Sequence, residues 1–132
     1  MIAKRRVLIV DDERAVADTL AVVFSFNGYV ARAVYSAEEA LAMVADYRPE
    51  LAIIDVYLPG MNGINLATLL IAGDFNLRVF LFSGQPGAMD LIAAAGHSFE
   101  LLVKPVHPSE ILSMAARLLN ASPEDSHEVL PN

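Results

Sequence analysis

Short apolar runs alternate along the chain with segments whose apolar residues recur every three or four positions. The apolar runs lie at 6–10, 29–34, 51–55, 78–83 and 100–104. Turn residues or charges bound each of them. Alternating strands and helices of this kind predict a parallel sheet whose two faces are both covered by helices. We therefore expect one α/β domain with five strands and five helices.

Capping residues and helix breakers predict where the helices begin and end. The expected helices run over 14–27, from Ser36 to about 47, over 63–72, over a short and weak segment within 84–96, and from Pro108 to 119. Ser36 and Glu39 form a capping box, and Gly28 is a C-terminal stop. The residues expected to face the core are Val16, Leu20, Val23, Phe24, Ala40, Leu41, Val44, Ile111, Leu112, Ala115, Leu118 and Leu119.

The charge balance indicates which partners to expect, and the chain length indicates how many domains. The 132 residues include 16 acidic and nine basic side chains, for a net charge of −7. This balance argues against direct binding to a nucleic-acid backbone and favours proteins or cations as partners. The chain length suits a single domain, which we expect over 1–120. Residues 121–132 are polar and rich in turn formers, so we expect a flexible tail.

The high apolar content does not predict a membrane protein. Hydrophobic residues make up 55% of the chain, and mean hydropathy is +0.46. However, charges or breakers interrupt every apolar run well before the length of a membrane span. The first run is also too short for a signal peptide. The chain has no cysteine, which agrees with a cytoplasmic protein.

Polar residues stand where the predicted strands end. Asp11 and Asp12 follow the first strand, Asp55 ends the third, Ser83 ends the fourth, and Lys104 ends the fifth. The carboxyl ends of parallel strands gather at one edge of the sheet, so these five side chains share one rim. Three neighbouring carboxylates repel one another unless a cation offsets their charge. Oxygen ligands alone favour a hard divalent ion, and we predict a Mg²⁺ site.

The same rim suggests phosphoryl transfer. A carboxylate beside Mg²⁺ and a lysine ammonium can attack a phosphoryl group, because both cations offset charge on the transferring oxygens. Asp55 is the expected acceptor because it ends the central strand, with Asp12, Ser83 and Lys104 arriving from its flanks. Ser83 would add a neutral hydroxyl donor.

Each rim residue also has a simpler interpretation. An aspartate at a strand end is most often a helix cap or a loop charge, and Ser83 could serve only as a cap. Lys104 could be a solvated side chain. Their joint placement at four strand ends is what favours the chemistry. The Lys104-Pro105 bond has a cis option that would turn the lysine inward.

Four segments resemble the receiver domain of two-component response regulators. They are VLIVDDE (7–13), IIDVYLPGMNG (53–63), FLFSG (80–84) and LLVKP (101–105). Their order and spacing match the family over about residues 5–120. The resemblance, to the single-domain type typified by chemotaxis regulators, implies a flavodoxin-like fold. This fold is a doubly wound three-layer sandwich of five βα units with strand order 2-1-3-4-5.

The resemblance also implies the roles of the rim residues. Asp55 would accept a phosphoryl group from the phosphohistidine of a sensor kinase or phosphotransfer protein, and Ser83 and Lys104 would hold the phosphate oxygens. The implied Mg²⁺ ligands are Asp12 and Asp55 directly, Asp11 through water, and the backbone carbonyl of Tyr57.

The chain departs from the family pattern in its switch. Receivers commonly carry Tyr or Phe three residues before the lysine, where this chain has Leu101, and the aromatic is Phe99. Either Phe99 substitutes from a shifted strand, or the coupling between Ser83 and the output face is altered. The resemblance places that face on the fourth helix, fifth strand and fifth helix.

Three hypotheses follow from the sequence. The first is a stand-alone, Mg²⁺-dependent phospho-accepting receiver without an output domain, as a monomer or weak homodimer. We expect a regulator rather than an enzyme, with at most slow self-phosphorylation and autodephosphorylation. The second is a binding module whose acidic rim holds a metal or protein but never takes phosphate. The third is a hydrolase using Asp55 as nucleophile, for which Tyr57 is a poor general acid near neutral pH.

Overall fold

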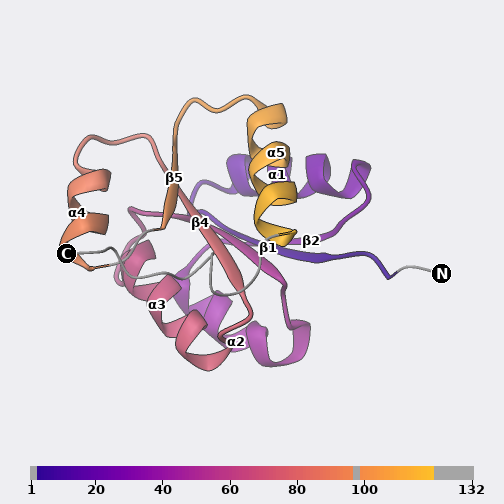
Figure 1. Ribbon diagram of the computed structural model, residues 1–132, viewed down its shortest axis with the longest axis horizontal. Helices are drawn as coiled ribbons and strands as arrows, with labels where there is room; N and C mark the ends of the chain where they lie inside the picture. The colour runs from indigo at the N-terminus through magenta and orange to yellow at the C-terminus, as the bar shows by residue number, and fades with distance from the viewer. Residues whose placement is uncertain (1–2, 97–98, 121–132) are drawn as a thin grey trace.

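A five-stranded parallel sheet lies between two layers of helices (Figure 1) in the computed structural model, which describes residues 3–96 and 99–120. The strands are β1 (Arg6–Val10), β2 (Val30–Val34), β3 (Leu51–Asp55), β4 (Arg78–Ser83) and β5 (Glu100–Val103). They pair in the order β2-β1-β3-β4-β5. The predicted doubly wound, flavodoxin-like topology is confirmed. The predicted tail at 121–132 lies outside the described residues.

The helices are split between the two faces of the sheet. They are α1 (Arg14–Phe26), α2 (Ala37–Tyr47), α3 (Gly63–Gly73), α4 (Ala88–Ala94) and α5 (Pro108–Leu119). Figure 1 shows α1 and α5 on one side of the sheet and α2 and α3 on the other. Within the described part of the chain, none of the helices has the length and apolar character needed to cross a bilayer.

Successive strand residues point to opposite faces and build two cores. On β1, Val7 and Ile9 join the cluster beneath α1 and α5, while Leu8 and Val10 join the cluster beneath α2 and α3. Every residue of β3 is buried, as expected for a central strand covered on both faces. The site-bearing end of β3 is therefore fixed from both sides.

The predicted boundaries agree with the structure to within a residue or two. One half of the capping box that we predicted for α2 forms: the Ser36 hydroxyl accepts a hydrogen bond from the Glu39 backbone N–H at 3.1 Å. The Glu39 carboxylate accepts from the N–H of Tyr35, one residue before the N-cap, in place of the Ser36 N–H. The fifth strand ends at Val103, so the prediction that Lys104 belongs to the strand was wrong by one residue.

The prediction that Leu41 faces the core was wrong. Leu41 is 38% exposed and lines a surface groove between α2 and α3. The helix instead buries Ala37 and Ala40, with Met43 and Val44 partly covered. This short helix has apolar residues on more than one face, so the sequence does not determine which face is buried. The small alanines are the buried residues because they let the helix pack closely on the sheet.

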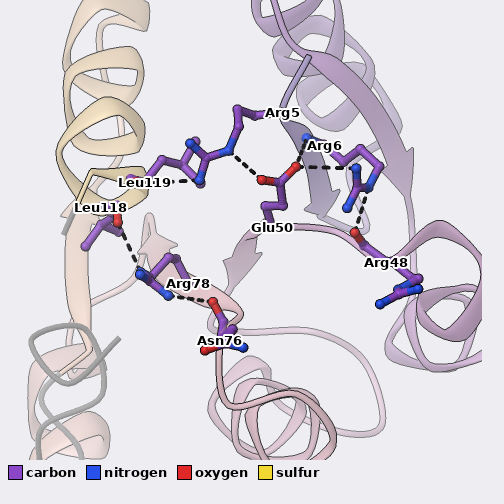
Figure 2. Close-up of polar contacts among 8 residues, drawn as sticks. All are labelled: Arg5, Arg6, Arg48, Glu50, Asn76, Arg78, Leu118 and Leu119. Carbon is purple, nitrogen blue, oxygen red and sulfur yellow. Dashed lines mark hydrogen bonds and ion pairs between the residues drawn. The ribbon is translucent and has the colours of Figure 1, made fainter. Parts of the chain in front are cut away.

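The amino edge of the sheet is tied to the end of α5 by arginines (Figure 2). The buried Arg78 donates from Nε to the Leu118 carbonyl at 3.2 Å, and Arg5 donates to the Leu119 carbonyl at 3.3 Å. Arg5 also pairs with Glu50, which precedes β3. These contacts satisfy carbonyls that the last turn of a helix leaves without intrahelical partners. They fix α5 at the edge opposite the acidic rim.

Candidate functional site

Three aspartates meet at the carboxyl edge of the sheet. Val10 of β1 pairs with Ile54 of β3, so the next residues, Asp11 and Asp55, emerge side by side. One carboxylate oxygen from each of Asp11, Asp12 and Asp55 lies within 4.8 Å of the others. The structure thus brings together the three carboxylates selected from the sequence.

The three aspartates differ in exposure. The Asp11 side chain is fully buried, Asp55 is 6% exposed, and Asp12 is open to solvent. One Asp11 oxygen accepts a hydrogen bond from the Glu13 N–H at 2.9 Å, in the turn just before α1. Glu13 is the N-cap of α1, and the helix has no side-chain capping bond, so Asp11 does not cap it.

Lys104 lies between two of the carboxylates. Its ammonium is 3.0 Å from an oxygen of Asp11 and 3.2 Å from an oxygen of Asp55. It also lies 4.5 Å from the centre of the Phe82 ring. Although burial favours the neutral amine, the hydrogen bond to Asp11 and the charge of Asp55 raise the pKa of Lys104 above its ordinary value.

The connection after β5 turns Lys104 toward the rim. The backbone N–H of Lys104 donates to the Ser83 carbonyl at 2.8 Å, which continues the strand pairing by one residue. The Lys104-Pro105 peptide bond is cis. Ser83 and Lys104 therefore leave neighbouring strands at the same level of the sheet.

The surroundings of Asp55 disfavour the charged form of its carboxylate. Burial raises its pKa, the Lys104 charge opposes that rise, and the neighbouring Asp11 adds to it. Three carboxylates against one ammonium leave an excess of negative charge. A cation entering the rim would relieve this repulsion.

The donor set fits a hard divalent cation. Only carboxylate oxygens form the cluster, and Asp12 keeps its carboxylate exposed beside the nearly buried Asp55. Mg²⁺ favours a few carboxylates completed by water. The residues present therefore match the metal predicted from the sequence.

The backbone N–H of Tyr57 donates to the Asp55 carboxylate at 3.2 Å, which orients that carboxylate.

Gly63 allows the close approach of α3 to the acceptor. A Cβ at this position would lie 2.1 Å from the Asp55 backbone oxygen and 2.9 Å from a side-chain carbon of Ile54. The Gly63 N–H also donates to the Val56 carbonyl at 2.8 Å. The start of α3 thus packs directly on the backbone that carries the Asp55 carboxylate.

Ser83 ends β4 and is buried, but its hydroxyl is engaged within its own loop. The Gln85 N–H donates to the Ser83 oxygen at 3.1 Å, and the hydroxyl lies 3.4 Å from the Gln85 carbonyl. The structure therefore places Ser83 on the rim, with its hydroxyl bonded to the loop that leads to α4.

The register of β5 places Leu101, rather than Phe99, nearer to Ser83. Ser83 pairs with Val103 and Leu81 pairs with Leu101. Leu101 lines a small pocket of about 240 Å³ with the loop after Ser83. Phe99 is buried one residue before β5 begins, in the cluster on the α2 and α3 face. Phe99 therefore lies outside β5, and Leu101 is the residue that pairs within the strand.

Sequence reasoning missed one side-chain contact at the site. The Tyr57 hydroxyl, in the loop after β3, donates to the Pro86 carbonyl in the loop after β4 at 3.1 Å. We had assigned only the Tyr57 backbone carbonyl. The two residues lie in different loops, and neither belongs to a pattern that predicts their contact.

Comparison with known proteins agrees with this geometry. Residues 7–116 match the family described as the response regulator receiver domain. Response regulator MprA of Mycobacterium bovis is 33% identical over 126 residues, which are 93% of this chain and 54% of the relative. The chain thus spans about half the length of the curated relatives it matches.

Two solved structures share the fold closely. A putative response regulator from Chloroflexus aurantiacus is 30% identical, with a TM-score of 0.80 over 90% of this chain and all of that chain. A CheY-like response regulator receiver domain protein from Methanospirillum hungatei is 27% identical. Its TM-score is 0.81 over 89% of this chain and 95% of that chain.

Proposed function

This chain belongs to the response regulator receiver domain family of two-component signalling, and on that basis we propose that it accepts a phosphoryl group on Asp55. The donor is the phosphohistidine of a sensor kinase or phosphotransfer protein. The observation that carries the proposal is the Asp55 carboxylate at the end of a fully buried strand. An ammonium lies 3.2 Å away, and two further carboxylates lie close by.

The transfer step uses groups that this chain supplies. An oxygen of the ionised Asp55 attacks phosphorus as the phosphorus–nitrogen bond breaks. The electron pair of that bond goes to the ring nitrogen, and the donor leaves as neutral imidazole because its other ring nitrogen carries a proton. Lys104 offsets charge on the phosphoryl oxygens. Its position between Asp11 and Asp55 keeps the ammonium at the rim before the donor arrives.

Mg²⁺, when bound, supplies further positive charge at the transferring oxygens. Asp12 and Asp55 would bind it directly, Asp11 would act through water, and the Tyr57 carbonyl would complete the protein ligands. The exposure of Asp12 and the burial of Asp11 support this division. Asp11 is already bonded to Lys104 and to the Glu13 N–H, which leaves Asp12 freer to meet an ion.

Phosphorylation would alter binding to a downstream protein. We assign this output to the face formed by α4, β5 and α5, where Met89, Leu91 and Val103 are 64%, 42% and 66% exposed. Ser83 couples the site to this face, because its loop leads directly into α4. The net charge of −7 supports protein partners rather than direct contact with nucleic acid.

The chain acts as a regulator rather than an enzyme. It turns over only through slow, Mg²⁺-dependent self-phosphorylation and autodephosphorylation. We expect it in the cytoplasm, as a monomer or a weak homodimer.

The metal requirement gives the first test. Native protein, incubated with acetyl phosphate and Mg²⁺, should gain one phosphoryl group that is stable to acid and labile to base. Chelation of Mg²⁺ or the Asp12→Asn substitution should reduce the initial rate at least about tenfold, as expected when a charge-neutralising ligand is lost. Asp46→Asn is the matched control, because Asp46 is an exposed carboxylate on α2.

The same measurement separates the competing hypotheses. A binding module would bind Mg²⁺ without incorporating phosphate, and a hydrolase would release phosphate rapidly in many turnovers. Equal labelling of the native protein with and without Mg²⁺ would count against the proposed mechanism.

A further inference from the structure

Tyr57 joins the two loops that flank the acceptor. It follows Asp55 by two residues, and its hydroxyl donates to the Pro86 carbonyl at 3.1 Å. Pro86 lies in the segment between Ser83 and α4. One hydrogen bond therefore connects the loop after β3 with the loop after β4.

The Tyr57 end of this link is held in place. Its backbone N–H donates to the Asp55 carboxylate, and its half-buried ring packs against the core beneath α2 and α3. Tyr57 is therefore bonded to the acceptor residue, and the packing of its ring restrains the position of its hydroxyl.

The Pro86 end lies at the start of α4. The next residue, Gly87, is the N-cap of that helix and has a φ of +92°. A Cβ on Gly87 would lie 3.5 Å from the Tyr57 hydroxyl oxygen, so the hydroxyl lies near the N-cap of α4. A bond to Pro86 therefore restrains the residue that begins α4.

Among residues 3–96 and 99–120, few other contacts fix this end of α4. The helix has seven residues, its N-cap makes no side-chain hydrogen bond, and only Ala88 and Ile92 are buried. Met89 and Leu91 face solvent. Leu101 and the exposed Val103 border the pocket of about 240 Å³ beside the loop. A small, weakly anchored helix next to open space can change position at low cost.

To donate to a phosphate oxygen, the Ser83 hydroxyl would give up its bond to the Gln85 carbonyl at 3.4 Å. The same hydroxyl accepts from the Gln85 N–H at 3.1 Å, one residue before Pro86. A change in this pairing would act on the loop that carries the Pro86 carbonyl. The bond to Tyr57 belongs to the loop conformation in which Ser83 faces Gln85.

We propose that the hydrogen bond from Tyr57 to Pro86 is a tether that stabilises the resting conformation of the loop after β4 and opposes the rearrangement that phosphorylation drives. This inference rests on the proposed function of Asp55 as acceptor. Tyr57 is a positioning residue: it sets how much of the unphosphorylated protein occupies the active conformation.

Linkage fixes the sign of the effect. A bond made only in the resting state stabilises that state by the net free energy of the bond, and it lowers the population of the active state by the corresponding factor. Removing it raises the affinity for any ligand that selects the active state by the same factor. For one ordinary hydrogen bond that factor is about three to ten.

The test uses Tyr57→Phe and beryllium fluoride with Mg²⁺, a mimic of the aspartyl phosphate. Tyr57→Phe keeps the ring and removes only the hydroxyl. Tyr35→Phe is the matched control, because the Tyr35 hydroxyl donates to Asp18 on α1, away from the loop after β4. The measurements are the dissociation constant for beryllium fluoride, hydrogen exchange of residues 84–92 without ligand, and the free energy of unfolding.

Tyr57→Phe should bind beryllium fluoride about three to ten times more tightly than native protein, with faster exchange at residues 84–92 and unchanged binding in Tyr35→Phe. Equal or weaker binding by Tyr57→Phe would overturn the tether, even if exchange increases. If native protein binds no beryllium fluoride, the proposed function fails instead. Faster exchange in Tyr57→Phe would then still report the bond itself.

Discussion

A single glycine determines how closely α3 can approach the acceptor. Gly63 follows Asp55 by eight residues in sequence, yet any side chain there would overlap the Asp55 backbone oxygen. The overlapping atom belongs to the backbone, so no rotation of a side chain can relieve the contact. Gly63, the last residue of the IIDVYLPGMNG segment, is therefore required by packing.

We predict that Gly63→Ala destabilises the fold by at least about 2 kcal/mol, as overpacking against a rigid backbone does. The displaced Asp55 should also lose phosphorylation rate. Gly73→Ala is the control at the other end of α3, where a Cβ meets nothing within 4 Å. It should be neutral or stabilise the helix by up to about 1 kcal/mol. Chemical denaturation of both variants measures the difference, and equal stabilities would contradict the packing argument.

The rim residues could be chosen from sequence because parallel topology leaves them little freedom. Once the apolar runs are assigned to parallel strands, their carboxyl ends must share an edge. Asp11 and Asp55 needed only the register of β1 against β3 to become neighbours. The contact between Tyr57 and Pro86 depends on the paths of two loops, for which the sequence contains no periodic pattern.

At the scale of elements, the site depends on helices that are anchored unequally. The structure anchors α5 at its C-terminus through Arg78 and Arg5, whereas α4 is short and has two buried residues. The element that leads away from Ser83 is thus the one that can shift. The opposite edge of the sheet serves as a fixed base.

We predict that Arg78→Met lowers the free energy of unfolding by about 1 to 3 kcal/mol, because it leaves the Leu118 carbonyl without its buried donor. Arg117→Met removes an ion pair to Glu100 whose side chains are both largely exposed, and it should cost less than about 1 kcal/mol. Urea denaturation compares the two. A larger loss for Arg117→Met would show that the amino edge does not anchor α5.

The periodicity of apolar residues predicted which helices and strands form, but not which side of each helix is buried. The strands alternate cleanly between two covered faces, so their pattern is unambiguous. In α2, several apolar residues compete for the inward direction, and packing on the sheet selects Ala37 and Ala40 over Leu41. The end of β5 was also missed by one residue, because Lys104 keeps a strand-like backbone hydrogen bond to Ser83 after the strand has ended.

At the scale of the whole molecule, structure and chemistry occupy opposite edges of one sheet. The amino edge joins β1, β4 and α5 through arginines (Figure 2), and the carboxyl edge gathers three carboxylates and one lysine. The buried β3 connects the two edges. A rigid strand that ends in a solvent-reachable carboxylate keeps the acceptor in place while the loops beside it rearrange.

The central claim is that Asp55 is the residue that takes the phosphoryl group. Borohydride reduces an aspartyl phosphate to homoserine, so peptide mass spectrometry after reduction identifies the phosphorylated residue directly. Native protein treated with acetyl phosphate and Mg²⁺ should contain homoserine at position 55, and Asp55→Asn should contain none. Homoserine at Asp11 or Asp12 in the native protein, or its absence from position 55, would contradict the account.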